Sequence, residues 1–254
     1  MEKISDKLHI STITFISEID SNIDLKNLYE KFNSDDDIKY IEYGNNPVKG
    51  EKVKKIKKPR NKKEKKYFYN QLTLHINCEK IVNVKIFNNG KIQMTGVKSK
   101  DQGKKVVSIF LNKLSSLSLE DKELVLENIN PQITKYKIAL INSDFNIGFK
   151  INREILHRII IDKNYYSSFE PSIYPGVNIK YYFNKNNKNN GICHCSVPCD
   201  GKGKNGLCKK ITIAVFNSGN IIITGGNSVD HLLTAHKFIH DLINERKNDL
   251  KIKE

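Results

Sequence analysis

The sequence predicts an α+β fold built from two pseudo-symmetric repeats. The phrase FNNGKIQMTG begins at Phe87 and returns 129 positions later as FNSGNIIITG, which begins at Phe216. Each copy is typical of a strand, a tight Asn-Gly or Ser-Gly turn and a second strand, followed by a segment with helical spacing. Two copies are too few for a solenoid, in which three or more units normally stack. A pair of related α+β units is therefore expected.

The likeness between the two halves extends upstream of the hairpins. Ile23 and Leu28 match Ile151 and Leu156 at an offset of 128. This spacing places the repeat boundaries well before each hairpin. The predicted segments are a first repeat at 9–114, a partly helical linker at 115–135, a second repeat at 136–243 and a charged C-terminal tail at 244–254. A basic insertion at 49–66 interrupts the first repeat, and a Cys-rich insertion at 184–210 interrupts the second.

A helix is expected after each hairpin. Ser99 and Gln102 fit a capping box, and Ser228 stands at the same place in the second copy. The residues that follow recur at helical spacing and predict one apolar face per helix. These residues are Val106, Val107, Phe110, Leu111 and Leu114 in the first copy, and Leu232, Leu233, Ile239, Leu242 and Ile243 in the second.

Alternation along the hairpin strands predicts one apolar and one mixed face. The apolar face suits packing under the helix and comprises Val82, Val84, Ile86, Ile92 and Met94 in the first copy and Ile213, Val215, Ile221 and Ile223 in the second. The mixed face carries Lys, Thr, Asn, Gln and Ile, with Phe87 and Phe216 at equivalent places. Two interpretations of these rings stay open at this point: functional exposed residues, or residues at the edge of the core.

The charge of the chain favours a polyanionic partner. The formal net charge is +15, and residues 49–66 alone hold 11 Lys or Arg against 2 Glu. Such a block repels itself and predicts a loosely ordered loop. Its functional interpretation is an arm that neutralises phosphates, because attraction to a polyanion follows from charge alone. The alternatives are a solubilising insertion or an import signal.

Several classes of protein find no support in the sequence. No apolar run approaches 18 residues, and the start MEKISDKLHI lacks the apolar stretch of a secretory signal, so an intracellular, non-secreted protein is expected. There is no Ser-His-Asp arrangement, no phosphate-binding loop and no convincing pair of catalytic carboxylates. The sequence therefore does not predict an enzyme.

With these motifs in view, the chain resembles the TATA-box-binding protein family. That family has two imperfect repeats, each with a strand, a Phe-x-Ser-Gly-Lys turn, a strand that ends in Thr-Gly, and a long helix. FNNGKIQMTGVKS and FNSGNIIITGGNS match this pattern, and SSFEPSIYPG at 167–176 is close to the family's Tyr-Glu-Pro-Glu-Leu-Phe-Pro-Gly segment. IDLKNL at 23–28 and EYGNNP at 42–47 correspond to landmarks of the first repeat. The resemblance spans about His9 to Ile243, apart from the two insertions.

The resemblance implies a saddle: two pseudo-symmetric repeats sharing one curved antiparallel sheet, with helices on the convex side and the concave face on the DNA minor groove. This family is a standard example of a protein that bends DNA with inserted apolar wedges, and that mechanism is taken from the resemblance. The implied DNA-intercalating residues are Phe87, Phe216, Tyr174 and, aligned less directly beside the basic insertion, Tyr69. A Tyr wedge must also satisfy its hydroxyl group.

Further contacts follow from the same resemblance. The implied minor-groove contacts are Thr95, Thr224, Thr12, Gln93 and Ile222, and the implied phosphate contacts are Lys91, Lys98, His75 and Lys180. Lys85 and Gln93 stand where the family has small apolar residues, and Asn220 and Asn227 stand where it has Lys. These departures favour a relaxed AT-rich preference over a strict one, since minor-groove readout is largely AT against GC. With the two insertions, they also favour a large DNA virus as the source.

The second insertion contains a candidate metal site. Cys193, Cys195, Cys199 and Cys208 follow the spacing C-x-C-x₃-C-x₈-C, with His194 between the first two. Four thiolates within 16 residues, beside Gly and Pro, suit one tetrahedral zinc ion. Disulfides and free thiols are the alternatives, and an intracellular setting disfavours disulfides. Cys78 stands alone and is expected to behave as a small buried or half-buried hydrophobe.

The sequence thus predicts a TATA-box-binding-like general transcription factor. It would bind AT-rich promoter DNA in the minor groove, bend it and nucleate transcription initiation, with no cofactor required for DNA binding and structural zinc as a candidate. The implied partners are double-stranded DNA, factors resembling transcription factors IIA and IIB, and RNA polymerase, in the nucleus or a viral replication compartment. The alternatives are an architectural DNA-binding protein with little sequence specificity and a protein–protein adaptor that retains the saddle.

Overall fold

A computed structural model describes residues 8–51, 67–184, 186 and 190–252. The chain divides into two compact units. We call Ile13–Ala139 the first unit, and Leu140–Glu254 together with the N-terminal residues up to Thr12 the second unit. The strands β1 (His9–Ile19) and β7 (Ile133–Asn146) each contribute residues to both units. Most of the basic insertion, residues 52–66, lies outside the described residues.

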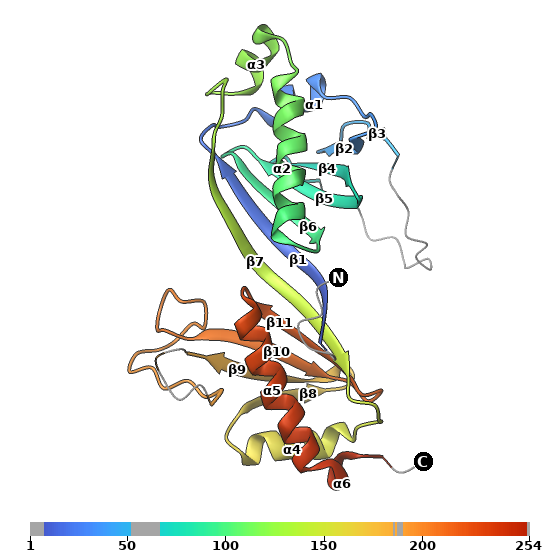
Figure 1. Cartoon of the computed structure of the whole chain (residues 1–254), viewed down its shortest axis with the longest axis vertical. Coiled ribbons are helices and arrows are strands. Elements are labelled where there is room, and N and C mark those ends of the chain that lie inside the picture. The colour runs from blue at the N-terminus through green and yellow to red at the C-terminus, as the bar shows by residue number, and fades with distance from the viewer. Residues whose placement is uncertain (1–7, 52–66, 185, 187–189, 253–254) are drawn as a thin grey trace. The chain divides into compact units, whose positions relative to one another are not determined.

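The first unit is an antiparallel sheet with helices on one face (Figure 1). Its strands pair in the order β3-β2-β4-β5-β6-β1-β7. Helix α2 contacts β4 and β6, and helix α1 contacts β2, β4 and α3. The bounds are α1 (Leu25–Lys31), β2 (Ile38–Tyr43), β3 (Lys49–Gly50), β4 (Gln71–Cys78), β5 (Lys80–Phe87), β6 (Lys91–Val97), α2 (Lys100–Ser115) and α3 (Leu119–Val125).

The second unit repeats this arrangement. Its strands pair in the order β1-β7-β11-β10-β9-β8, and helix α5 contacts β11, β10 and β9. The bounds are α4 (Arg153–Asp162), β8 (Tyr166–Glu170), β9 (Tyr174–Phe183), β10 (Lys209–Val215), β11 (Asn220–Gly226), α5 (Val229–Glu245) and α6 (Lys247–Leu250). Among the described residues, no helix is both long and apolar enough to cross a bilayer.

Burial confirms the predicted alternation of strand faces. All nine residues assigned to the apolar face are fully buried, at 0% exposure, so they form the core under the helices. The helix residues predicted to face them are buried as well, except that Leu111 and Leu233 are half-buried. This burial explains why a two-residue alternation in the strands and a helical spacing in the next segment occur together in each repeat.

Serine residues begin the two long helices as predicted. Ser99 and Ser228 cap α2 and α5, each accepting a hydrogen bond from the backbone N–H three residues on. In the first helix the Gln102 side chain accepts from the N–H of Lys98 and not of Ser99, which departs from an ideal capping box. Both repeats therefore have the serine cap. In α2 the second hydrogen bond of the capping box, made by Gln102, goes to the residue before the serine.

An equivalent backbone hydrogen bond stabilises the hairpin turn in each unit. The backbone carbonyl of Gly90 accepts a hydrogen bond from the N–H of Ile19 (3.1 Å), and that of Gly219 accepts one from Ile147 (3.0 Å). Both glycines have positive φ, +73° and +82°. A Cβ at Gly219 would lie 2.3 Å from the carbonyl oxygen of Phe149, so the turn needs glycine for both conformation and space.

The start of the predicted loosely ordered basic loop lies in regular structure, and the charged tail contains a short helix. Lys49 begins the predicted basic loop, yet it pairs in β3 with Ile41 and its amino group donates to the carbonyls of Tyr29, Glu30 and Phe32, at 2.6, 3.1 and 2.7 Å. Lys49 therefore caps the C-terminal end of α1, where unpaired carbonyls favour a cation. In the charged tail, α6 forms a short helix and Leu250 is fully buried.

Candidate nucleic-acid interface

The face of each sheet opposite its helices is polar and partly exposed. We call it the open face. In the first unit the amino group of Lys85 donates to the side-chain oxygen of Gln71 at 3.3 Å. Alternate residues of β4, β5 and β6 line this face, and they are half-buried or exposed: Gln71, Thr73, Asn83, Lys85, Phe87, Lys91, Gln93 and Thr95. Such a surface offers hydrogen-bond donors and acceptors and has no continuous apolar patch among these residues.

Two predicted wedge residues meet on the open face of the second unit. Tyr174 begins β9 and Phe216 directly follows β10, and their rings lie edge to face with 5.7 Å between centroids. Tyr174 is 38% exposed, and Phe216 is half-buried. Gly176 lies beside the pair, since a Cβ there would be 2.9 Å from the Tyr174 ring and 3.2 Å from the Phe216 ring. The absence of a side chain at Gly176 leaves room for this ring contact.

Counted from the paired strands, Tyr69 in the first unit corresponds to Tyr174 in the second. Leu72 pairs with Ile86, one residue before Phe87, and Val177 pairs with Val215, one residue before Phe216. Tyr69 and Tyr174 each precede the paired residue of their own segment by three positions. This equivalence depends on strand pairing and not on the likeness of the sequences beside the basic insertion.

The two aromatic pairs nevertheless differ. Tyr69 is 56% exposed and packs edge-on against Tyr43, with 6.0 Å between ring centroids. Among the described residues, no ring packs on Phe87 in the way that Tyr174 packs on Phe216. By register, Gln71 holds the position of Gly176, and its side-chain oxygen accepts the hydrogen bond from Lys85 on the open face. The first unit therefore has a long side chain where glycine leaves room for the ring contact in the second unit.

The predicted minor-groove residues differ in how far their side chains are exposed. Thr95 is exposed, and Gln93 and Thr12 are half-buried. Ile222 is 37% exposed, which is high for an isoleucine in a strand. The hydroxyl of Thr224 donates to the side-chain oxygen of Asn142 on β7. The Asn142 amide was not among the predicted contacts.

The predicted phosphate contacts separate into accessible and buried side chains. Lys91 and Lys98 are half-buried. The amino group of Lys180 donates to the Thr212 hydroxyl at 3.0 Å, and burial, with Lys210 nearby, lowers the Lys180 pKa. His75 is only 8% exposed, with its ring stacked on Tyr40 at 4.6 Å. Little of this ring is exposed, so we do not include His75 among the proposed phosphate contacts.

Two aromatic residues beside Tyr69 were not among the predicted contacts. Tyr67 and Phe68 are 49% and 56% exposed. With Lys85 and Glu42 they line a cavity of about 300 Å³ on the open face of the first unit. The signal for them was the run YFY directly after the basic segment. Aromatic side chains next to a basic arm are a common surface for stacking on nucleic acid.

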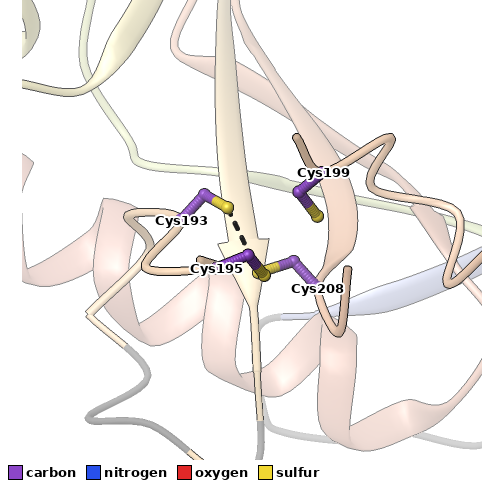
Figure 2. Close-up of side chains that lie close together, drawn as sticks. All are labelled: Cys193, Cys195, Cys199 and Cys208. Carbon is purple, nitrogen blue, oxygen red and sulfur yellow. Dashed lines mark hydrogen bonds between the residues drawn. The ribbon is translucent and has the colours of Figure 1, made fainter. Parts of the chain in front are cut away.

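The four predicted zinc ligands converge in the loop between β9 and β10. Figure 2 shows the side chains of Cys193, Cys195, Cys199 and Cys208 turned toward one another, and their sulfur atoms all lie within 4.8 Å of one another. The backbone N–H of Leu207 donates to the Cys195 sulfur and lowers the pKa of that thiol to about 7. All four thiols are free, and Cys78 is buried as predicted.

Fold and repeats agree with one family. The family model described as "Transcription factor TFIID (or TATA-binding protein, TBP)" matches residues 7–117 and 135–246. The chain belongs to the TATA-binding protein family. The predicted fold class is thereby confirmed: two repeats of an antiparallel sheet with helices. Membership of this family also supports a general role as a DNA-binding protein of transcription.

Individual relatives agree with this membership. A "TATA-box-binding protein-like" protein of Acanthamoeba polyphaga mimivirus is 29% identical over 266 residues, which covers 96% of this chain and 67% of the relative. The "TATA-box-binding protein" of Candida albicans is 25% identical over 164 residues, 64% of this chain and 53% of that protein. The chain thus spans about two thirds of the first relative and about half of the second.

A solved structure shares the fold. The structure of "Methanococcus jannaschii TBP" superposes with a TM-score of 0.56 at 20% identity, covering 94% of this chain and 99% of the archaeal one. At this level of identity the similarity concerns the fold alone. It extends over both repeats of this TATA-binding protein family member, because nearly all of each chain is covered.

Proposed function

We propose that this chain is a TATA-box-binding-like transcription factor that binds AT-rich promoter DNA through its open faces. It inserts aromatic wedges into the minor groove, bends the duplex and nucleates transcription initiation. The observation that carries the proposal is the contact between Tyr174 and Phe216 on a polar open face, with Tyr69 and Phe87 at equivalent register in the first unit. Membership of the TATA-binding protein family supports it.

In the proposed step, the free-energy cost of unstacking base pairs is balanced by new contacts between protein and DNA. Separating two base pairs costs a few kcal/mol per step, and the bend offsets this by bringing more protein surface onto the DNA. An aromatic ring suits the wedge because it buries a large apolar area with little loss of conformational freedom. Phe87 and Phe216 carry no polar group, so they are the principal wedges, and Tyr174 and Tyr69 support them.

The surrounding residues supply the readout. Minor-groove edges of A·T pairs present only acceptors, which suit the hydroxyls of Thr95 and Thr224 and the amides of Gln93 and Asn142. These groups distinguish AT-rich from GC-rich DNA in general, so the proposed preference is for composition and deformability. Ile222 and Thr12 supply further contact to the groove, and the cationic side chains of Lys91, Lys98 and Lys180 neutralise phosphates along the edges.

One acidic residue lies on the open face of the second unit. Asp144 pairs in register with Ile222, and its carboxylate lies 3.4 Å from the His9 ring. A carboxylate facing DNA repels phosphates, so Asp144 lowers the affinity of this unit, as Glu42 does at the open face of the first unit. The basic segment next to the first unit in the chain would offset part of this repulsion.

The partners follow from the proposed role. Promoter-bound protein would assemble with factors resembling transcription factors IIA and IIB and with RNA polymerase. Such a role implies the nucleus or a viral replication compartment as the location. DNA binding itself needs no cofactor in this proposal, because every proposed contact is made by a side chain of the chain.

The experiment measures affinity for AT-rich and GC-rich duplexes of equal length at two salt concentrations. Bend angle is followed in parallel by energy transfer between dyes at the duplex ends. A transcription factor of this kind should prefer the AT-rich duplex at both salts and bend it. Tight binding with no preference and a steep salt dependence would instead favour an architectural protein. If neither duplex is bound, the result would favour a protein–protein adaptor that does not bind DNA.

A further inference from the structure

We propose that the loop between β9 and β10 holds one structural zinc ion, bound by Cys193, Cys195, Cys199 and Cys208. We call residues 190–208 the cysteine loop. This site is independent of the proposed DNA contacts, since none of the four thiols belongs to a wedge or groove residue. Its chemistry is that of a closed four-thiolate centre, which suits zinc.

The sulfur separations are those of a metal tetrahedron. With Zn–S bonds of about 2.3 Å, the edge of a thiolate tetrahedron is about 3.8 Å long. The Cys195–Cys208 and Cys208–Cys193 sulfur distances are 3.5 and 3.7 Å, and all four sulfurs lie within 4.8 Å of one another. A disulfide requires about 2.05 Å between the sulfurs. The cluster thus has room for an ion at its centre and lacks the geometry of a covalent pair.

Neighbouring groups complete the site. The backbone N–H of Leu207 donates to the Cys195 sulfur at 3.4 Å, and the Asn184 side-chain amide donates to the Cys208 sulfur at 3.8 Å. Such donors to thiolates are a usual second layer around a metal. His194 is exposed and its Nε2 lies 3.2 Å from Asn190 Oδ1. The ligand set is therefore four cysteines, without the histidine.

The backbone of the loop is shaped around the sulfurs. Gly206 has φ +79°, and a Cβ there would lie 2.7 Å from the Cys199 sulfur. Asp200 and Asn205 are bridged by a backbone hydrogen bond of 3.0 Å, which closes the turn between the third and fourth cysteines. Glycine at this close approach permits Cys199 to reach the other three thiols.

The cysteine loop exposes two of its apolar side chains. Val197 is 54% exposed and Leu207 is 69% exposed. Short segments that bury so little apolar surface usually depend on disulfides or a metal for order. The four thiols are free, so zinc is the group that gives this loop a defined structure. Binding would release the thiol protons, and Lys202 and Lys204 of the same loop would balance part of the doubly negative centre.

Purified full-length protein, prepared under reducing conditions without chelator, tests the proposal by elemental analysis and native mass spectrometry. One zinc ion per chain is expected. Cobalt(II) exchanged into the site should give the visible absorption bands of tetrahedral thiolate coordination. His194→Ala is the matched control and should retain full zinc, whereas Cys208→Ser should lose it.

Zinc removal supplies a second readout that does not depend on any variant folding. A strong chelator should expose the cysteine loop to limited proteolysis, while the β-rich circular dichroism signal of the rest of the chain persists. Two results would overturn the proposal: no zinc together with no cobalt bands on reconstitution, or a mass lowered by the hydrogens lost in disulfide formation. Because metal content is measured without DNA, failure here leaves the proposed DNA-binding function unaffected.

Discussion

The ring of Tyr174 packs edge-on against the ring of Phe216, with 5.7 Å between the centroids and 62° between the planes. Tyr174 begins β9 and Phe216 follows the end of its antiparallel partner β10, and the rings meet because Gly176 carries no side chain. In the first unit Gln71 replaces that glycine, and Tyr69 packs on Tyr43. The repeats therefore share a register but present different wedges, which makes them separately testable.

Replacing Phe216 or Phe87 with Ala should reduce both affinity and DNA bend. A variant without the ring cannot hold a base step unstacked, and a straighter duplex meets less of the protein surface. Energy transfer between dyes on a short AT-rich duplex measures the bend. Lys91→Ala is the control and should weaken binding and its salt dependence while keeping the bend. A bend equal to that of the parent protein in both Phe variants would exclude this mechanism.

Gly176→Ala should disturb the second-unit wedge without unfolding the sheet. The new methyl group meets the Tyr174 and Phe216 rings, at 2.9 and 3.2 Å, so the rings must separate. We expect a smaller bend angle at nearly unchanged thermal stability. The reciprocal change, Gln71→Gly, opens the same space in the first unit and should increase the bend. Identical bend angles for the parent and both variants would show that ring spacing does not matter.

Deleting residues 52–66 should weaken binding about equally on AT-rich and GC-rich DNA. This segment holds 10 Lys or Arg and 1 Glu. If its charges neutralise phosphates, the slope of log affinity against log salt becomes shallower by about 0.9 for each phosphate that the variant leaves unneutralised. Titrations at several salt concentrations measure that slope. An unaltered slope would assign the segment to solubility or to import.

Lys49→Met should lower stability and leave the salt slope alone, although Lys49 is the first residue of the basic run. Its amino group donates to three carbonyls at the end of α1 and lies 4.6 Å from the Tyr29 ring centroid. Losing hydrogen bonds from a charged donor costs about 1.5–3 kcal/mol. Denaturant unfolding measures the loss. The exposed Lys80→Met serves for comparison and should change stability little; a similar small effect for Lys49 would contradict its capping role.

Gly219→Ala should destabilise the chain by about 3 kcal/mol, since the methyl group adds a backbone clash to the strain of a positive φ. The clash is with the Phe149 carbonyl oxygen at 2.3 Å. Gly148→Ala is the matched control, because its φ is also positive (+89°) but nothing lies within 4 Å. It should cost about 1–2 kcal/mol, from conformation alone. Equal losses in the two variants, measured by denaturant unfolding, would show that the close approach has no energetic consequence.

The amino-acid sequence alone is enough to predict the repeats, the strand faces and the helix caps. These features depend on interactions between near neighbours in the chain: a two-residue alternation, a Ser before a helix, a glycine in a tight turn. The alternation alone therefore assigns Val84 and Ile213 to the core, where both are fully buried, and Phe87 and Phe216 to the opposite face. The family motifs depend on the same local patterns.

Features that join distant segments are visible only in the folded chain. His75 is a predicted phosphate contact, but the Tyr40 ring from another strand covers it. Lys49 belongs to a basic run, but the fold brings the end of α1 to its amino group. The pairing of Tyr174 with Phe216 depends on cross-strand register, and the meeting of four sulfurs depends on how one loop closes. The partners of a side chain across the fold are set by packing, which no local pattern encodes.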